Sequence, residues 1–106
     1  MIKFVDMGLI ETYKDEIKRL CRNHKVKTLY SFGSVNTTSF SNESDVDLVV
    51  DFDTTDPIEY TDNYFHFKFE LERILHRSID LLEHKAIKNP FLRDNIDRSK
   101  MLIYGQ

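Results

Sequence analysis

The sequence predicts one α/β domain of the α+β kind over residues 1–106, in which helices pack on a small β-sheet. Three observations predict this class. Segments with helical periodicity alternate with short runs of β-branched and aromatic residues. One of these runs is almost continuously hydrophobic, as in a strand covered on both faces. Hydrophobic residues make up 41% and charged residues 31% of the chain, which is typical of a globular protein rather than a disordered one.

The predicted elements follow the order helix, strand, strand, helix, strand, helix, with a short final strand. The start of the second helix is the clearest boundary: Asp56 can cap it, Pro57 suits its first position, and Glu59 can complete a capping box. Asn89 followed by Pro90 starts the last helix in a similar way. We expect helices at 8–24, 57–76 and 90–98, and strands at 26–32, 46–52, 78–82 and 101–104. The order of the strands in the sheet stays open.

Composition narrows the classes of function. The net charge is −3 with mixed signs, which argues against direct nucleic-acid binding. No apolar run approaches the roughly 20 residues that span a bilayer, and we expect neither a membrane segment nor a secretory signal. A single cysteine, Cys21, favours a reducing cytoplasm. Basic residues near the C-terminus are expected to be solvated, although one or two could meet a phosphate: Lys85, Lys88, Arg93, Arg98 and Lys100.

Asp45 and Asp47 are separated by one residue at the start of a predicted strand. Strand side chains alternate, so both carboxylates point to one face while Val46 points into the core. Two carboxylates this close repel each other unless a positive group lies between them. Oxygen ligands suit Mg²⁺, which commonly takes one or two carboxylates together with substrate phosphate and water. The pair therefore predicts a metal site, although two loop acids beside a strand would give the same pattern.

Gly33 and Ser34 close the preceding strand, where α/β folds place their ligands. Glycine lets backbone approach a phosphate closely, and the serine hydroxyl can donate to phosphate oxygens. Ten residues separate Ser34 from Asp45. Four fixed positions at this spacing would match by chance in about one of a few hundred such chains. Asp80 lies in the third predicted strand between apolar residues, where an acid is costly unless it is paired or binds metal, although an exposed edge would also accommodate it.

These residues resemble the minimal nucleotidyltransferases (MNT domains) of the DNA polymerase β superfamily, whose pattern is Gly-Ser, ten residues, Asp-x-Asp and a third Asp on a later strand. The resemblance spans nearly the whole chain and implies a small mixed sheet with helices packed on it. It implies that Gly33 and Ser34 bind triphosphate, that Asp45 and Asp47 bind Mg²⁺, and that Asp80 completes the site. Residues 35–40 contain neither the Arg nor the Gly that family members often have there.

The resemblance also implies a function. Many MNT proteins are encoded beside a HEPN-domain ribonuclease toxin, and some transfer AMP from ATP to a toxin tyrosine as its antitoxin. We therefore expect a protein adenylyltransferase that uses ATP and two Mg²⁺ ions, with Asp80 accepting the proton of the attacking hydroxyl. The alternative is a non-catalytic nucleotide-binding or protein-binding antitoxin or assembly subunit that acts by contact.

The second predicted helix carries an apolar patch on the side away from its core-facing stripe. Ile58, Phe65 and Phe69 gather there at helical spacing, and they predict a surface for homo- or hetero-oligomer formation. The alternative is that the N-terminal residues 1–5 cover the patch.

Overall fold

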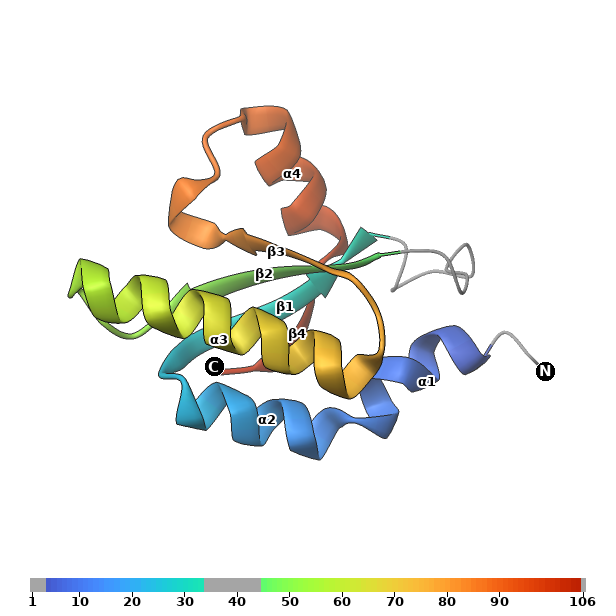
Figure 1. Cartoon of the computed structure of the whole chain (residues 1–106). Helices are drawn as coiled ribbons and strands as arrows, with labels where there is room; N and C mark the ends of the chain where they lie inside the picture. Colours follow the sequence, from blue (N-terminus) through green and yellow to red (C-terminus); the bar gives the residue numbers. More distant parts are fainter. Residues whose placement is uncertain (1–3, 34–44, 106) are drawn as a thin grey trace.

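The computed structural model describes residues 4–33 and 45–105 and shows helices on both faces of one sheet (Figure 1). Two helices precede the first strand, and a short 3-10 helix, η2, follows the third. The elements are α1 (Phe4–Thr12), α2 (Lys14–Asn23), β1 (Val26–Phe32), β2 (Val46–Phe52), α3 (Pro57–Leu75), β3 (Ile79–Glu83), η2 (His84–Ala86), α4 (Pro90–Ser99) and β4 (Met101–Tyr104). The expected α/β class is confirmed, and both the first and the second strand have the predicted bounds.

The sheet is mixed, with strand order β3-β2-β1-β4. β1 pairs antiparallel with both β2 and β4. β2 and β3 are parallel, because α3 carries the chain back to the end of the sheet at which β2 began. β3 and β4 are therefore the edge strands, and the two central strands bring together the segments on either side of residues 34–44.

The core lies between the sheet and the pair α2 and α3, which cover one face (Figure 1). In β2, Val46, Leu48, Val50 and Phe52 alternate into this core and are at most 1% exposed. The intervening Asp47 and Asp51 point to the opposite face, which we call the acid-bearing face. α4 lies on that side of the sheet. Alternation along one buried strand thus separates the apolar packing from the carboxylates.

The first predicted helix is two helices, so the expectation of one helix over 8–24 is wrong. α1 ends at Thr12 and α2 begins at Lys14, with Tyr13 between them at φ −105° and ψ 15°. A β-branched residue followed by an aromatic one weakens helix propagation there. Asp15 and Glu16 then occupy the first turn of α2, where negative charge is favourable.

The start of α3 confirms one expectation and corrects another. The Asp56 carboxylate accepts a hydrogen bond from the Ile58 N–H at 3.0 Å, as an N-cap should. Glu59 does not close a capping box: it accepts from the Thr54 hydroxyl at 2.6 Å and pairs with Lys25. The Asp56 N–H donates instead to the Thr54 oxygen at 3.3 Å. Across the described residues, no helix is both long and apolar enough to cross a membrane.

Candidate active site

Asp47 and Asp80 are direct neighbours across the parallel pair β2 and β3. Ile79 and Leu81, on either side of Asp80, face the core, so the carboxylate of Asp80 lies on the acid-bearing face with that of Asp47. Adjacent strands are about 4.8 Å apart, which places two acids side by side. Burial, and then the negative charges of Asp80 and Asp45, raise the pKa of Asp47. The charged form of Asp47 is therefore disfavoured until a cation approaches.

Gly33 lies against the same carboxylate. It follows β1, whose last residue Phe32 pairs with Asp47, and its φ is +74°. A Cβ at Gly33 would lie 2.6 Å from Asp47 Oδ2, far inside contact distance. Glycine is thus required twice, once for the left-handed backbone and once for the close approach. The end of β1 therefore lies directly against Asp47, the candidate metal ligand of β2.

Asp45 and Ser34 complete the predicted set in different ways. Asp45 directly precedes β2, is exposed, and lies near enough for its charge to raise the pKa of Asp47. Ser34 lies outside the described residues, as does the segment 35–44 between the two parts of the pattern. The structure therefore brings Gly33, Asp45, Asp47 and Asp80 to one end of the sheet.

Asp80 is not a buried acid, so the expectation that burial would force it to be paired or to bind metal is wrong. β3 is an edge strand and Asp80 is exposed, so its carboxylate is not forced to find a partner by burial. This is the alternative that the sequence left open. Solvent can therefore reach Asp80 directly.

The acids fit Mg²⁺ by the chemistry of their oxygen donors. Burial and the charges of Asp80 and Asp45 disfavour the charged form of Asp47, and a divalent cation among these acids would relieve the repulsion. Within the described ranges, no three His, Cys, Asp or Glu side chains already form a group that could hold a metal. Mg²⁺ commonly takes one or two protein carboxylates and fills the rest of its shell with phosphate and water.

Lys100 also lies on the acid-bearing face, and sequence reasoning did not single it out. Its Nζ lies 4.7 Å from the centre of the Tyr30 ring and donates to Asp97 at 3.2 Å. The next residue, Met101, pairs with Ser31, so Lys100 stands beside the end of β1 that leads to Gly33. In the sequence, the only indication of a role for Lys100 was its place among the basic residues near the C-terminus.

Other members of that cluster are engaged within the fold. Arg98 pairs with Asp94 at 2.6 Å, and Lys85 lies 3.6 Å from Asp51. The Arg93 guanidinium donates to the carbonyl oxygens of His84 and Ile87 at 3.3 and 3.1 Å. Arg93 therefore ties η2 to α4, and Lys100, directly before β4, is the member that stands beside the end of β1 leading to Gly33.

Gly33 at the end of β1 thus lies against Asp47, the second acid of the Asp-x-Asp pair, and Asp80 is the neighbour of Asp47 in the register of β2 and β3. The chain belongs to the family described as "Polymerase beta, Nucleotidyltransferase", whose profile matches residues 15–106. The expected family is thereby confirmed, and the protein is a nucleotidyltransferase. A candidate protein adenylyltransferase, MJ1379 of Methanocaldococcus jannaschii, is 34% identical over 97 residues, which are 84% of this chain and 94% of that protein.

Solved structures agree with the fold. A protein described as a minimal nucleotidyltransferase superposes with a TM-score of 0.74 at 23% identity, over 90% of this chain and 93% of the other. A chain from the structure of a tri-AMPylated HEPN toxin of Shewanella oneidensis in complex with an MNT antitoxin has a TM-score of 0.64 at 21% identity. It covers 91% of this chain and 72% of the other. At these identities the likeness shows the fold alone.

Proposed function

We propose that this protein transfers AMP from ATP to a tyrosine hydroxyl of a HEPN-type partner protein and thereby acts as its antitoxin. The observation that carries the proposal is the contact of Gly33 with Asp47, together with the register that sets Asp80 beside Asp47. The similarity to a candidate protein adenylyltransferase supports a protein acceptor. The similar fold in the structure of a tri-AMPylated HEPN toxin in complex with an MNT antitoxin supports a HEPN-type partner.

Gly33 and Ser34 would hold the triphosphate where β1 ends, because backbone can approach phosphate only where no Cβ intervenes. Two Mg²⁺ ions, when bound by Asp45, Asp47 and Asp80, would neutralise these acids and the developing charge on the phosphates. Lys100 stands on the β4 side of β1, whereas the acids stand on the β2 side, and it would supply a further positive charge toward the triphosphate. It would take the place of the arginine that residues 35–40 lack.

Asp80 would act as the base. The tyrosine oxygen forms a bond to the α-phosphorus of ATP, the bond from that phosphorus to the bridging oxygen breaks, and pyrophosphate leaves. The phenolic proton passes to the Asp80 carboxylate. An exposed carboxylate on an edge strand can meet a side chain presented by another folded protein, whereas a buried one could not. The open position of Asp80 therefore favours a macromolecular acceptor.

A second candidate function, neutralisation by contact alone, is favoured by the apolar patch on α3. Ile58, Phe65 and Phe69 are 74%, 48% and 55% exposed, as the helical spacing predicted. The Phe65 and Phe69 rings lie 6.1 Å apart between centroids and form one surface. We propose that this patch contacts a partner protein or a second copy of the chain.

Single-turnover transfer of α-³²P-labelled AMP separates the two functions. The acceptor is a HEPN-type protein, and the Asp80→Asn variant is compared with the parent. We expect labelling of the acceptor by the parent and a large loss of rate in the variant with little change in ATP affinity, because a base is needed chiefly in the transition state. Inhibition of the partner without any labelling would instead establish neutralisation by contact. Parental rates in Asp80→Asn would assign Asp80 a structural role.

A further inference from the structure

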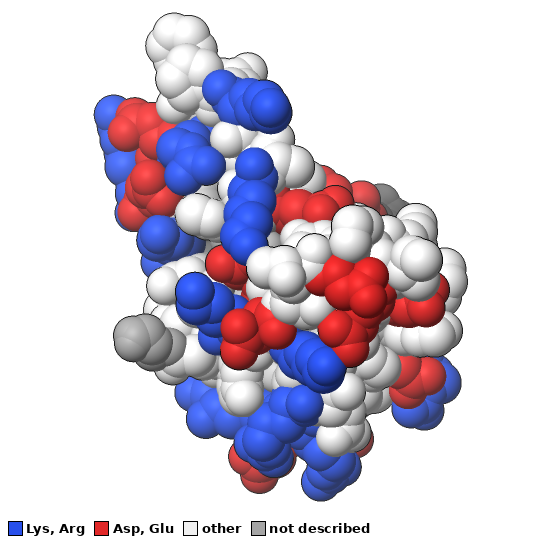
Figure 2. Space-filling model, turned by 90° about the vertical axis from the view of Figure 1, so that its left-hand side faces the viewer, with Lys and Arg blue, Asp and Glu red and all other residues white. Residues whose placement is uncertain are grey.

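α2 presents a row of three cations. Lys14, Lys18 and Arg22 follow one another at intervals of four residues and therefore lie along one side of the helix, about 6 Å apart at 1.5 Å per residue. Ile17 and Cys21 are buried in the core, which fixes the rotation of the helix and holds the row at a constant orientation. Figure 2 shows Lys and Arg gathered along the lower edge of the molecule, where α2 lies.

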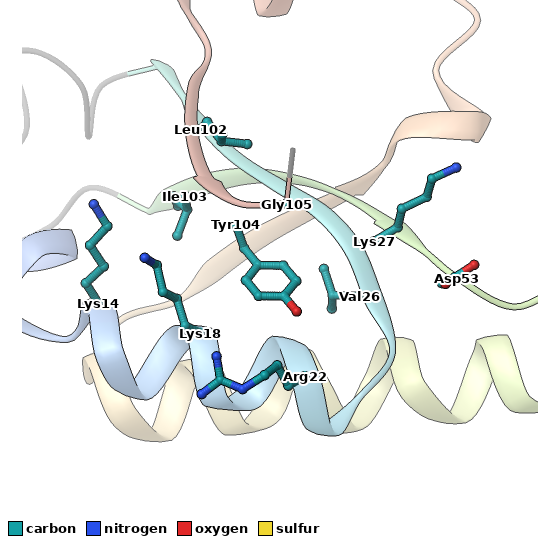
Figure 3. A pocket seen from close by; sticks show the side chains of 10 residues that line it. All are labelled: Lys14, Lys18, Arg22, Val26, Lys27, Asp53, Leu102, Ile103, Tyr104 and Gly105. Carbon is teal, nitrogen blue, oxygen red and sulfur yellow. The ribbon is translucent and has the colours of Figure 1, made fainter.

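The row lines a cleft between α2, the edge strand β4 and the start of β1 (Figure 3). Its volume is about 680 Å³, within the 300–1,000 Å³ typical of ligand sites. Lys27 on β1 also lines the cleft, apart from the row and on the side of Asp53, and the Tyr104 ring lies beside Lys18 and Arg22. Asp53 is the one acid among the described lining residues. The cleft is thus strongly positive, with one aromatic surface inside it.

Among the described residues, three of the four cations that line the cleft lack an ion pair. In the part of the chain that the structure describes, Lys18, Arg22 and Lys27 form no ion pair, and Lys14 lies 3.6 Å from an exposed glutamate, Glu11. Outside the cleft most described cations have a carboxylate within 4 Å: Lys25, Lys68, Arg73, Lys85, Arg98 and Lys100. Unpaired like charges around one hollow repel each other, and a bound polyanion would remove that repulsion.

We propose that this cleft binds single-stranded nucleic acid, with successive phosphates on Lys14, Lys18 and Arg22 and a base against Tyr104. A cationic groove with an aromatic ring inside it is the combination that single-stranded nucleic acid uses, whereas an acidic peptide would match the cations alone. The expectation of no direct nucleic-acid binding rested on the net charge, which does not show that positive charge is concentrated here. The cleft lies beside α2, on the face opposite the carboxylates of Asp47 and Asp80, so it is a site separate from the one proposed for ATP.

The test measures the fluorescence anisotropy of a labelled oligouridylate of about ten nucleotides, within the usual site sizes, at increasing salt. Three to four phosphate contacts predict a slope of log affinity against log salt of roughly −2 to −3. K18E/R22E should weaken binding at least tenfold and reduce the slope by about 1.4. The matched control R19E/K88E has the same change of net charge at positions that do not line the cleft, and it should bind as the parent does.

Two further measurements make the outcome decisive. Tyr104→Leu should weaken the binding of the oligouridylate but not the binding of polyglutamate of equal charge. Calorimetric ATP binding with Mg²⁺ should be unchanged in K18E/R22E, so a failure of this proposal can be told apart from a failure of the proposed adenylyl transfer. Absence of binding by the parent, equal binding by the two double variants, or competition by polyglutamate as strong as that by the oligouridylate would each overturn the proposal. The last result would point to an acidic protein.

Discussion

Gly33 leaves no room for a side chain beside Asp47: a Cβ built on it would lie 2.6 Å from Asp47 Oδ2. Gly33→Ala should therefore displace the carboxylate, and the left-handed backbone adds about 1–2 kcal/mol of strain. We expect a lowered melting temperature and loss of ATP binding, measured by differential scanning fluorimetry and calorimetry.

Gly8→Ala is the matched control, because Gly8 lies in α1 and a Cβ there meets nothing within 4 Å. It should keep ATP binding and gain up to about 1 kcal/mol of stability. If Gly33→Ala binds ATP as well as this control does, Gly33 is not part of the nucleotide site.

The raised pKa of Asp47 predicts that the stability of the metal-free protein depends on pH. Its pKa is raised above the ordinary value of 3.8 by burial and by Asp80 and Asp45, so the folded state holds the proton more tightly than the unfolded state. Below pH 3.8 the group contributes no penalty, and as pH rises through the folded pKa the metal-free protein loses stability relative to an uncharged side chain. Asp47→Asn should therefore gain on the parent between acid and neutral pH.

Urea unfolding in EDTA at several pH values measures this difference, since the other acids are common to both proteins. Adding Mg²⁺ at neutral pH should stabilise the parent and not Asp47→Asn. A stability difference that does not change with pH would show that the carboxylate of Asp47 is not under this repulsion.

The position of Lys100 beside the end of β1 predicts that its charge contributes to nucleotide affinity. Lys100→Met keeps the apolar stem and removes the charge beside the end of β1. A charge-assisted contact in a partly exposed site is worth about 1 kcal/mol, so we expect the Michaelis constant for ATP to rise about fivefold with a smaller change in kcat. Lys88→Met, just before the N-cap of α4, is the control and should match the parent. Identical constants in both variants would exclude Lys100 from the triphosphate site.

The α3 patch predicts separable effects on association and stability. Phe65→Glu with Phe69→Glu should change the free energy of unfolding by about 0.5 kcal/mol or less per site, because both side chains are about half exposed. The same variant should no longer associate with the partner or with itself, which size-exclusion chromatography with light scattering measures. A double variant that melts normally and still assembles would show that the patch is not an interface.

Local chemistry predicted the elements well where one signal dominated. β1 is a run of β-branched and aromatic residues that Gly33 ends, and α3 begins at a capping Asp56 and a Pro57, so these boundaries followed from the residues alone. The break at Tyr13 did not, because the apolar stripe continues across it. Glu59 was misassigned since its partner Lys25 is 34 residues away in the chain.

The site was predictable as a set of residues but not as an arrangement. Spacing singled out Gly33 and Asp47, yet their contact depends on the antiparallel pairing of β1 with β2. The place of Asp80 at an exposed edge depends on strand order, which periodicity does not encode. The cationic cleft was missed because Lys27 and Tyr104 join α2 only through tertiary structure.

We propose that the end of the sheet holding Gly33, Asp45 and Asp47 is a metal-dependent nucleotide site. Calorimetric titration of ATP into the protein, in Mg²⁺ and then in EDTA, tests it most directly, with D45N/D47N as a variant that should keep its fold because it removes repelling acids. We predict binding by the parent in Mg²⁺, strong weakening in EDTA, and no metal dependence in D45N/D47N. Equal affinity of the parent in Mg²⁺ and EDTA, or full metal-dependent binding by the folded double variant, would contradict the claim.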